Sequence, residues 1–426
     1  MNYILIISYF FPPCPQTASS RIFGFVKEFK KNGYYPIIVT RQWEKSINTP
    51  KKSLASIGEG IIHNVYEDYE EYLLPYKSSI RDWFFIRSEK SRFYSIVSKT
   101  LTLFNSFLNP IITKTIPYSN LYFVSKNIIE ERKNQISNIF ISANPYLLFK
   151  FGYKLNKKFN IPWIADYRDA WTTNSMAKNE RLIFKFLYFF ERYFEKKWVN
   201  SCLFFTTVSE IYVNNINEII NKKGITLFNG YTELQENNFL EKDEVDRVTI
   251  LYSGSMYSNQ PVEDFLESVQ IINDFCDNKI SVCFLGVGYN QIQKQRILNS
   301  KHYNSTYIEL TDWVGKDILN KYIQNSDLLL LLSYQGFNGI PTSKIFEYLS
   351  TNKRILLYPS DNGILKEILS DSGNHYIIDS KSMLINFFKN LNHKQLPLKR
   401  NSNIEKYSTE YQVKLLIIEI NSYNER

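Results

Sequence analysis

The sequence has few of the residues that build disulfide frameworks and metal centres. Its 426 residues include only four cysteines and four histidines. The cysteines lie far apart and form no CxxC pair, so neither a disulfide framework nor a thiolate zinc site is indicated; they are Cys14, Cys202, Cys276 and Cys283. The histidines are equally scattered. We therefore expect no obligatory metal ion and no bound cofactor.

Long hydrophobic runs are also missing. No apolar run approaches the roughly 18 residues of a membrane span. Residues 1–11 are apolar, but they lack the basic start of a signal peptide and run directly into Pro12 and Pro13. We therefore predict a buried strand there. The expected location is the cytoplasm, and any membrane contact is expected to be peripheral, on the cytoplasmic face of the inner membrane.

What is present is the composition of a globular protein with an excess of positive charge. Hydrophobic residues make up 44% and charged residues 22% of the chain, and 51 Lys and Arg against 42 Asp and Glu give a net charge of +9. The length predicts two or three domains. The charge favours anionic partners such as phosphates or acidic lipids. Because no recognition motif accompanies it, nucleic acid is not expected as a partner.

Short apolar runs alternate with longer amphipathic segments along the chain. A strand, a helix and a strand follow one another at residues 3–8, 21–31 and 36–40, which is the order of a βαβ unit and predicts a parallel sheet. Further strands are predicted at residues 139–142, 163–165, 203–206 and 226–228, and then, in a second series, at 248–253, 281–285, 306–310, 328–332 and 354–358.

A polar, acidic segment at residues 232–247 separates the two series and is typical of a linker. We therefore predict an α/β protein with two doubly wound, Rossmann-like domains at residues 1–231 and 248–403. Ligands of such domains bind at the carboxyl ends of the parallel strands.

Two segments, residues 81–107 and 181–198, combine many aromatic residues with Lys and Arg and are predicted to be amphipathic helices. Helices of this kind can lie in a membrane interface, here an anionic one. The alternative is that their aromatic faces pack on the sheet. The sequence alone leaves both interpretations open.

Two loops of the first domain carry polar residues where ligands are expected. The first loop ends at Ser19 or Ser20, either of which can cap the following helix, and Arg21 adds a positive charge that could contact a phosphate. The second follows the strand at 163–165 and reads Asp166-Tyr-Arg168-Asp169. Two carboxylates flank one guanidinium, an arrangement that can bind hydroxyls or act as a general base. A structural salt-bridge network is the alternative.

The second domain carries a phosphate-site pattern. Thr342 and Ser343 follow a proline and are predicted to begin a helix, with Lys344 in its first turn and Glu347 one turn further. The lysine and free N–H groups suit a pyrophosphate, and the glutamate suits the two hydroxyls of a ribose. A plain capping arrangement is the alternative.

Taken together, these motifs resemble the GT-B-fold glycosyltransferases of the family-4-like group, over nearly the whole chain. The resemblance rests on "ISYFFPPCPQTASSRIFGFVKEFKKNGYYPIIVT", "ISANPYLL", "IPWIADYRDAW", "TVSE", "FNGY", "ILYSGSMY", "WVGK" and "GIPTSKIFEYLSTNKRIL". It implies two Rossmann-like domains facing across a cleft, with a nucleotide-sugar bound by the second and an acceptor by the first. It also implies that a C-terminal helix, at residues 404–426, packs back on the first domain.

Site residues follow from the resemblance position by position. Gly254 and Ser255 would approach the donor phosphates, and Trp313 and Val314 would lie by the nucleobase. The remaining donor-binding residues would be Thr342, Ser343, Lys344 and Glu347. The sequence departs from the group's pattern in that Gly339 replaces the first of two glutamates, and Asn259 and Gln260 stand where Arg and Lys are common. The group's usual histidine is also missing.

Near the position of that histidine lie Asp166, Arg168 and Asp169, and we expect these three residues to be catalytic, with Asp169 nearest the sugar. The expected reaction moves a sugar from a UDP- or GDP-sugar to a glycan acceptor, lipid-linked, in the synthesis of surface polysaccharide such as capsule or lipopolysaccharide. Retention of the sugar's stereochemistry is expected. Two alternatives stay open: a GT-B sugar-nucleotide epimerase, and a catalytically weak homologue that supports a partner transferase.

Overall fold

The computed structural model describes residues 2–14, 16–44, 47, 49–132, 134–173, 182–233, 247–277, 279–334, 336, 339–391 and 398–424. The chain divides into two compact units: Met1–Phe228 together with Gln412–Arg426, and Asn229–Tyr411. We refer to them as the first and second unit. Most of the predicted linker, residues 234–246, lies outside the described residues.

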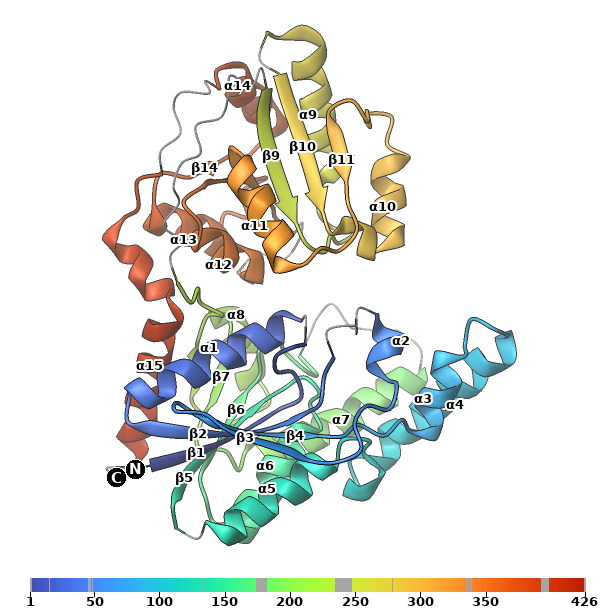
Figure 1. The fold of residues 1–426 in the computed structure, drawn as a ribbon, viewed down its shortest axis with the longest axis vertical. Coiled ribbons are helices and arrows are strands. Elements are labelled where there is room, and N and C mark those ends of the chain that lie inside the picture. Colours follow the sequence, from blue (N-terminus) through green and yellow to red (C-terminus); the bar gives the residue numbers. More distant parts are fainter. Residues whose placement is uncertain are drawn as a thin grey trace. The chain divides into compact units, whose positions relative to one another are not determined.

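The first unit is built on an eight-stranded sheet in the order β3-β4-β2-β1-β5-β6-β7-β8 (Figure 1). All neighbouring pairs are parallel except β3 and β4. The strands are β1 Asn2–Ser8, β2 Tyr34–Arg41, β3 Ile62–Val65, β4 Glu70–Leu74, β5 Ile136–Ser142, β6 Trp163–Asp166, β7 Phe205–Thr207 and β8 Gly224–Thr226.

Helices cover both faces of this sheet (Figure 1). They are α1 Thr17–Lys31, α2 Pro50–Ser53, α3 Ile80–Ile86, α4 Arg92–Leu108, α5 Asn120–Glu131, α6 Leu148–Phe159, α7 Leu182–Val199, α8 Glu210–Asn217 and α15 Thr409–Asn424. On one face, Phe25 of α1 and Leu416 of α15 join Ile4, Ile38 and Phe140 of the sheet in a single buried cluster. The central strands are buried on both faces, which explains their continuous apolar sequences.

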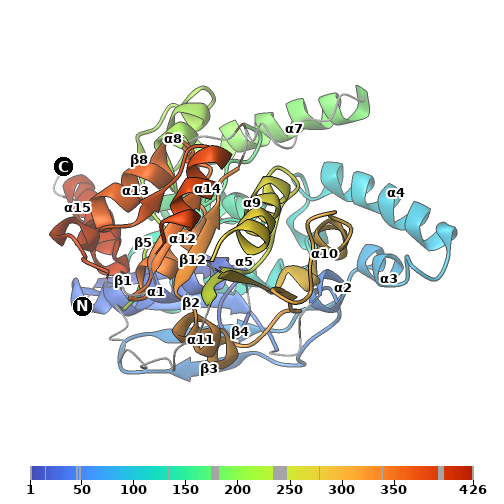
Figure 2. The ribbon, with the colours of Figure 1, turned by 90° about the horizontal axis from the view of Figure 1, so that it is seen from above.

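The region between β4 and β5 differs from the sequence prediction. The single helix expected at residues 81–107 is two helices, α3 and α4, separated by turns at residues 87–91. Folding back brings aromatic rings of the two helices together, for example Trp83 against Tyr94 at 5.8 Å and Phe84 against Phe93 at 6.4 Å between centroids. Ser79 begins α3 with a capping box that includes Asp82. Figures 1 and 2 both show α3 and α4 extending away from the sheet as an arm.

The second unit contains a six-stranded parallel sheet in the order β11-β10-β9-β12-β13-β14. Its strands are β9 Arg247–Ser253, β10 Lys279–Leu285, β11 Ile308–Leu310, β12 Leu328–Leu332, β13 Arg354–Tyr358 and β14 Tyr376–Ile377. Its helices are α9 Val262–Phe275, α10 Gln291–Leu298, α11 Lys316–Asn325, α12 Ser343–Leu349, α13 Ile364–Ser372 and α14 Lys381–Lys389. The buried cluster includes Ile250, Phe265, Leu330 and Phe388.

Two helix boundaries also differ from the prediction. Helix α1 begins at Thr17 with Gln16 at its N-cap, so Ser19 and Ser20 lie inside the helix and cap nothing. The C-terminal helix expected from residue 404 is a 3₁₀ helix, Ser402–Tyr407, followed by α15. Within α15, the side chains of Val413, Leu416 and Ile420 are fully buried in the core of the first unit.

Candidate functional site

Several residues that are predicted to bind the nucleotide-sugar lie together at the carboxyl ends of the strands in the second unit. β9 ends at Ser253, and Gly254 follows with a positive φ of 82°. Gly286, at the end of β10, has a φ of 85°, and a Cβ on it would lie 3.5 Å from the Gly254 backbone. A Cβ on Gly254 would in turn lie 3.3 Å from Cε of Lys344. Both glycines are therefore needed for the turn geometry, and Gly254 also for the approach of Lys344.

Lys344 lies in the first turn of α12, and its ammonium group is held in place by the β9 loop. Its Nζ donates to the Tyr252 hydroxyl and to the carbonyl of Ser255, and it lies 3.9 Å from the centroid of the Tyr252 ring. Desolvation lowers the pKa of Lys344 to about 7, and the nearby Glu347 partly opposes this effect. The ammonium group is therefore close to half-protonated at neutral pH, and an adjacent anion would favour its charged form.

The other predicted donor residues lie near these turns. Thr342 is the N-cap of α12, and its hydroxyl accepts from the Lys344 N–H. Glu347 is exposed on the same helix. Trp313 is 51% exposed in the loop after β11. That loop is joined to the β10 turn, because the Thr311 hydroxyl accepts from the Gly286 N–H and the Thr311 carbonyl accepts from Gly288. Ser343 opens α12, and Val314 lies in the Trp313 loop.

Gln260, which stands where the resembled group often has a cation, has a structural role here. Its side chain is buried, its Oε1 accepts from the Tyr252 hydroxyl and the Tyr257 N–H, and its Nε2 donates to the Leu332 carbonyl. The amide thus ties the β9 loop to the end of β12. Two described cations contact this loop: Lys344 donates to the carbonyl of Ser255, and Arg296 donates to the carbonyls of Tyr257, Ser258 and Gln260.

In the first unit, the predicted Asp166-Arg168-Asp169 cluster divides into two parts. Asp166 is fully buried, and its Oδ1 accepts from Arg21 at 2.9 Å and from Thr206 at 2.8 Å. Its Oδ2 accepts from the Ser142 hydroxyl at 2.7 Å. Asp166 therefore pairs with Arg21 rather than with Arg168. With no exposed surface, its carboxylate ties together α1, β5 and β7 and does not face a ligand.

Arg21 is correspondingly unsuited to the phosphate contact that we expected from the sequence. Its side chain is 1% exposed, and its Nη1 donates to the carbonyls of Leu227 and Phe228. The sequence prediction placed this residue at the start of the helix, exposed to a ligand. Because α1 begins four residues earlier, Arg21 instead lies under the helix and faces the sheet.

Asp169 and Arg168 form a separate, surface pair. Nε and Nη2 of Arg168 donate to Oδ2 of Asp169 at 2.9 and 2.6 Å, and the Asp169 side chain is 43% exposed. Arg168 has a φ of 28°, which is unusual for a residue with a side chain. Tyr146 holds the next turn of the loop, because its hydroxyl donates to the carbonyls of Asp169 and Ala170. Of the three predicted catalytic residues, Asp169 and Arg168 are thus the accessible ones.

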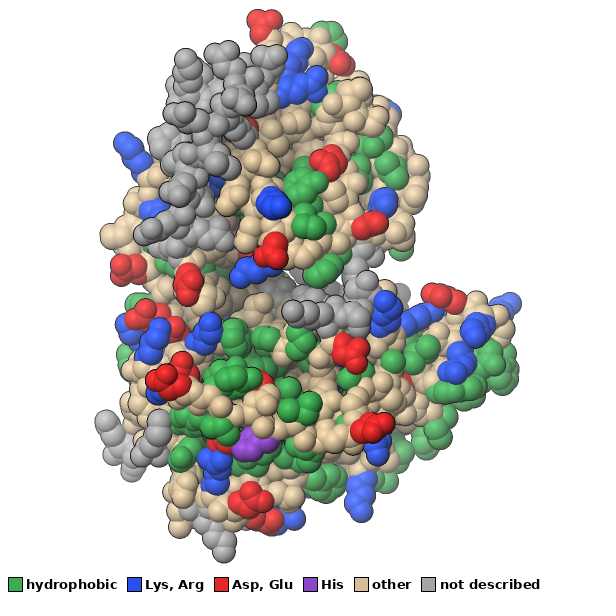
Figure 3. Space-filling view, in the orientation of Figure 1, with side chains coloured by type: hydrophobic (Ala, Val, Ile, Leu, Met, Phe, Trp, Pro, Cys, Tyr) green, Lys and Arg blue, Asp and Glu red, His purple; other side chains and the backbone are tan. Residues whose placement is uncertain are grey.

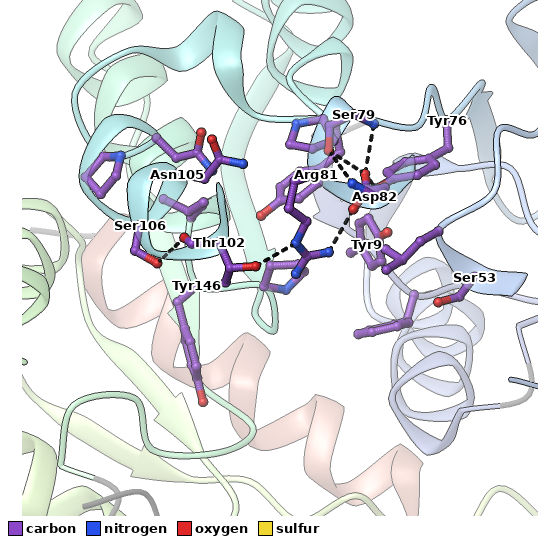
Figure 4. Close-up of a pocket in the computed structure, with 18 of the residues that line it drawn as sticks. Tyr9, Ser53, Tyr76, Ser79, Arg81, Asp82, Thr102, Asn105, Ser106 and Tyr146 are labelled. Carbon is purple, nitrogen blue, oxygen red and sulfur yellow. Dashed lines mark hydrogen bonds and ion pairs between the residues drawn. The ribbon is translucent and has the colours of Figure 1, made fainter. Parts of the chain in front are cut away.

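A cavity of about 440 Å³ lies beside this loop, entirely within the first unit (Figure 4). Its aromatic wall contains Tyr146 and Trp171, whose parallel rings are 5.1 Å apart, and Trp171 in turn stacks on Trp198. A second wall is also aromatic, and it is formed by Tyr9, Phe10, Trp43, Tyr76 and Tyr118. Flat apolar rings surrounded by hydrogen-bonding groups are the lining that polar ligands with apolar faces require.

The polar lining comes mostly from the α3–α4 arm, which the sequence analysis did not connect with a site. Arg81 donates to the Thr102 hydroxyl at 3.1 Å and to Asp82 at 2.7 Å (Figure 4). Glu191 of α7 also lines the cavity, and burial raises the pKa of its carboxyl. The capping box at Ser79 was the only sequence signal for this part of the pocket, and it predicts a helix start rather than a ligand.

No group of three or more His, Cys, Asp or Glu residues among those the structure describes is arranged to hold a metal ion. Within the same residues, no helix is both long and apolar enough to cross a membrane.

Sequence comparisons return no matching protein family and no matching curated protein. Structure comparison does find similar proteins. A trehalose-6-phosphate synthase from Burkholderia multivorans aligns with a TM-score of 0.60 and 8% identity over 100% of this chain and 99% of its own. An E. coli trehalose-6-phosphate structure bound with UDP-2-fluoro glucose gives 0.55 and 10% over 100% and 97%. Anabaena HepE in complex with UDP and glucose gives 0.53 and 8% over 100% and 98%. At these identities the likeness concerns the fold: the chain has the GT-B fold, with two Rossmann-like domains.

Proposed function

We propose that the protein is a glycosyltransferase that uses a nucleotide-sugar donor and a glycan acceptor. The observation that supports this most directly is Lys344, held beside Gly254 and Gly286 at the carboxyl ends of the second sheet. This is the edge where α/β domains bind nucleotides. Similar structures with the same fold contain a UDP-sugar, or UDP with glucose.

In the proposed reaction, the bond between the anomeric carbon and the diphosphate breaks, and a bond to an acceptor hydroxyl forms. The nucleoside diphosphate leaves with the electrons of the broken bond, and the acceptor hydroxyl gives its proton to a carboxylate, for which we propose Asp169. Lys344 would stabilise the charge that develops on the leaving diphosphate. The proposal also includes retention of the sugar's stereochemistry and a donor whose nucleotide is UDP or GDP.

Nucleotide binding is the first test of the proposal. A ligand that binds only the native state raises the melting temperature. UDP-, GDP- and CMP-sugars should therefore be compared in a thermal-shift panel, and at least one is expected to stabilise the protein. Nucleotide release should then be measured with and without a lipid-linked glycan. An epimerase would convert the donor without an acceptor, and a catalytically weak homologue would bind the donor and release nothing.

Replacing Lys344 with alanine is expected to weaken binding of the stabilising nucleotide-sugar by about 1.5–3 kcal/mol, the value of a charge-assisted hydrogen bond. The pH dependence should be specific. Because the pKa of Lys344 is lowered to about 7, the group is charged below pH 7 and loses its charge as the pH rises. Donor affinity should therefore fall between pH 7 and pH 9, while the sugar-diphosphate itself keeps its charge.

Lys344→Arg provides the matched control, since arginine stays protonated throughout this range. Its donor affinity should be nearly independent of pH even if its value is lower. Isothermal titration calorimetry at pH 6.5, 7.5 and 8.5 would measure all three proteins. An alanine variant that folds and binds the donor as well as the original would contradict the assignment of Lys344.

We further propose that the acceptor is lipid-linked, that it belongs to surface-polysaccharide synthesis, and that the protein binds a membrane surface from the cytoplasmic side. The support is an exposed apolar surface on α4 and α7, which includes Phe93, Phe104, Phe186 and Phe189, each between 59% and 66% exposed. The two helices are in contact at Phe107, whose ring lies 5.8 Å from Phe186 and 5.2 Å from Phe190. Figure 3 shows hydrophobic side chains together with Lys and Arg over the α3–α4 arm.

Vesicle binding tests this surface. The protein is expected to bind anionic vesicles, and added salt should weaken the binding because it screens the basic residues. The double variant Phe186→Ser and Phe189→Ser should reduce vesicle binding and leave donor binding unchanged. Phe190 is left in place because it is half-buried and packs against both Phe107 and Phe194, whereas Phe186 and Phe189 are more than 60% exposed. Ile211→Ser, at a 41% exposed position on α8, is the control. Equal loss in the control would contradict the proposal.

A further inference from the structure

Positive and negative side chains are unevenly distributed around the pocket in the first unit. We call the side of the pocket lined by Tyr9 and Tyr76 its floor. The charged groups at this floor or directly behind it include two guanidinium groups, Arg41 and Arg81, and one carboxylate, Asp82. Two of the three contact Tyr9 or Tyr76 directly: Arg41 donates to the Tyr9 hydroxyl, and the Tyr76 hydroxyl donates to Asp82. Arg81 is joined to them through Asp82. Electrostatic effects of Arg41 and Asp82 act on the pKa of both tyrosines. The floor therefore carries an excess of positive charge.

Both oxygens of Asp82, the carboxylate at the floor, accept hydrogen bonds from the protein itself. Oδ2 of Asp82 accepts from the Tyr76 hydroxyl and from both the N–H and the hydroxyl of Ser79, while Oδ1 accepts from Arg81. Its side chain is 2% exposed. Asp82 is thus the support of Arg81 and not a group that faces the pocket. Glu191, a second carboxylate in the pocket lining, belongs to α7, and burial raises its pKa.

Arg81 is held so that part of its guanidinium group faces the cavity. Nε is bonded to Thr102 and Nη1 to Asp82, and Figure 4 shows the group between these two partners. Nη2 has no hydrogen-bond acceptor within the described part of the chain. The amide of Asn105, one turn along α4 from Thr102, also lines the cavity and makes no side-chain hydrogen bond there. Two sets of N–H donors are therefore available on the same side of the pocket.

Arg41 lies behind the aromatic wall and is 1% exposed. Its guanidinium carbon is 4.0 Å from the Tyr76 ring centroid, 4.2 Å from that of Trp43 and 5.1 Å from that of Tyr9. No carboxylate pairs with it among the described residues, and its Nη2 is buried without a hydrogen-bond partner. A buried cation without a counter-charge is costly, and an anion in the adjacent pocket would offset that cost.

The geometry points to an acceptor that carries a phosphate ester, with its phosphate on Arg81 Nη2 and the Asn105 amide and its sugar against the aromatic walls. This inference rests on the proposed transferase function and adds the chemical class of the acceptor. A phosphate offers more acceptor oxygens than a carboxylate, and it suits a fork of guanidinium donors. The ester can come from a soluble sugar phosphate or from a lipid-linked sugar phosphate, since both have this group.

The test measures binding of glucose, glucose 1-phosphate, glucuronate and the octyl ester of glucose 1-phosphate to the full chain. An excess of UDP is present, so that the site around Lys344 is filled. Glucose 1-phosphate is expected to bind at least about tenfold more tightly than glucose or glucuronate, the effect of roughly one charge-assisted contact. A further gain for the octyl ester identifies a lipid-linked source, and equal affinity identifies a soluble one.

Arg81→Gln should reduce the affinity for glucose 1-phosphate by about 10- to 100-fold and leave that for glucose nearly unchanged. Arg81→Lys, which keeps the charge, should retain part of the discrimination, and it serves if the glutamine variant does not fold. Lys99→Gln, an exposed cation on α4, is the control and should change nothing. Equal binding of glucose and glucose 1-phosphate, tight glucuronate binding, or unchanged discrimination in Arg81→Gln would overturn the inference. If UDP itself fails to bind, it is the proposed function that fails.

Discussion

Asp166→Asn is expected to lower the free energy of unfolding by about 3–5 kcal/mol, the usual effect of breaking a buried ion pair. The substitution removes the negative charge that pairs with the Arg21 guanidinium, and the two side chains are only 1% and 0% exposed. It also weakens the hydrogen bonds from Ser142 and Thr206. Urea denaturation followed by circular dichroism would measure the change. Donor binding at the site proposed in the second unit should be preserved in the folded fraction.

A double-mutant cycle separates this ion pair from a general effect of the substitution. Arg21→Met removes the guanidinium, so Asp166→Asn in that background no longer breaks the ion pair between the two residues. The double variant is therefore expected to lose less stability than the sum of the single variants, because the two residues are coupled. Strict additivity would show that the pair does not contribute as the structure indicates.

Asp169→Asn, three residues further along the same loop, is expected to have the opposite profile. Because the Asp169 side chain is 43% exposed and its ion pair is with the partly exposed Arg168, its loss should change stability by less than about 1 kcal/mol. If Asp169 accepts a proton from the acceptor hydroxyl or orients it, sugar transfer should fall by about 10²-fold or more. Nucleotide release in the presence of acceptor, corrected for donor hydrolysis, is the measurement.

The amide in Asp169→Asn keeps the size of the side chain and removes its charge, so unchanged donor affinity provides the internal control. A variant with near-native turnover would assign Asp169 to the surface ion pair alone. Arg168→Gln distinguishes the two roles further. If the pair only holds the loop, both variants should lower the melting temperature equally and leave turnover unchanged.

Strands that are buried on both faces were predicted from the sequence more successfully than strands with only one buried face. Strands such as β1 and β12 are continuous apolar runs, and such runs mark a parallel sheet without further information. The hairpin of β3 and β4 was missed because its short strands mix polar and apolar residues and lie at the edge of the sheet. His63 and Glu70, for example, pair with each other across the two strands. The break between α3 and α4 was missed because contacts between distant aromatic rings decide it, rather than Pro or Gly.

The candidate sites also differ in how well they could be predicted, depending on whether adjacent or distant residues form them. The glycine turn and Lys344 could be predicted because each depends on a few adjacent residues. The partner of Asp166 could not be, since Arg21 is 145 positions away, whereas Arg168 is close in sequence and offered the simpler pairing. The pocket in the first unit draws on seven or more separate segments. No local pattern indicates that Tyr146, Trp171 and Arg81 line one cavity.

The return of α15 to the first unit has a consequence for how the chain is made. Val413, Leu416, Ile417 and Ile420 complete a core whose other buried members lie before residue 228. On the ribosome, residues 229–411 must be synthesised before these side chains emerge, which takes roughly 10–40 s at about 5–20 residues per second. During that interval an apolar face of α1 and the sheet has no covering helix, so the nascent chain is a candidate client for chaperones that recognise exposed hydrophobic surface.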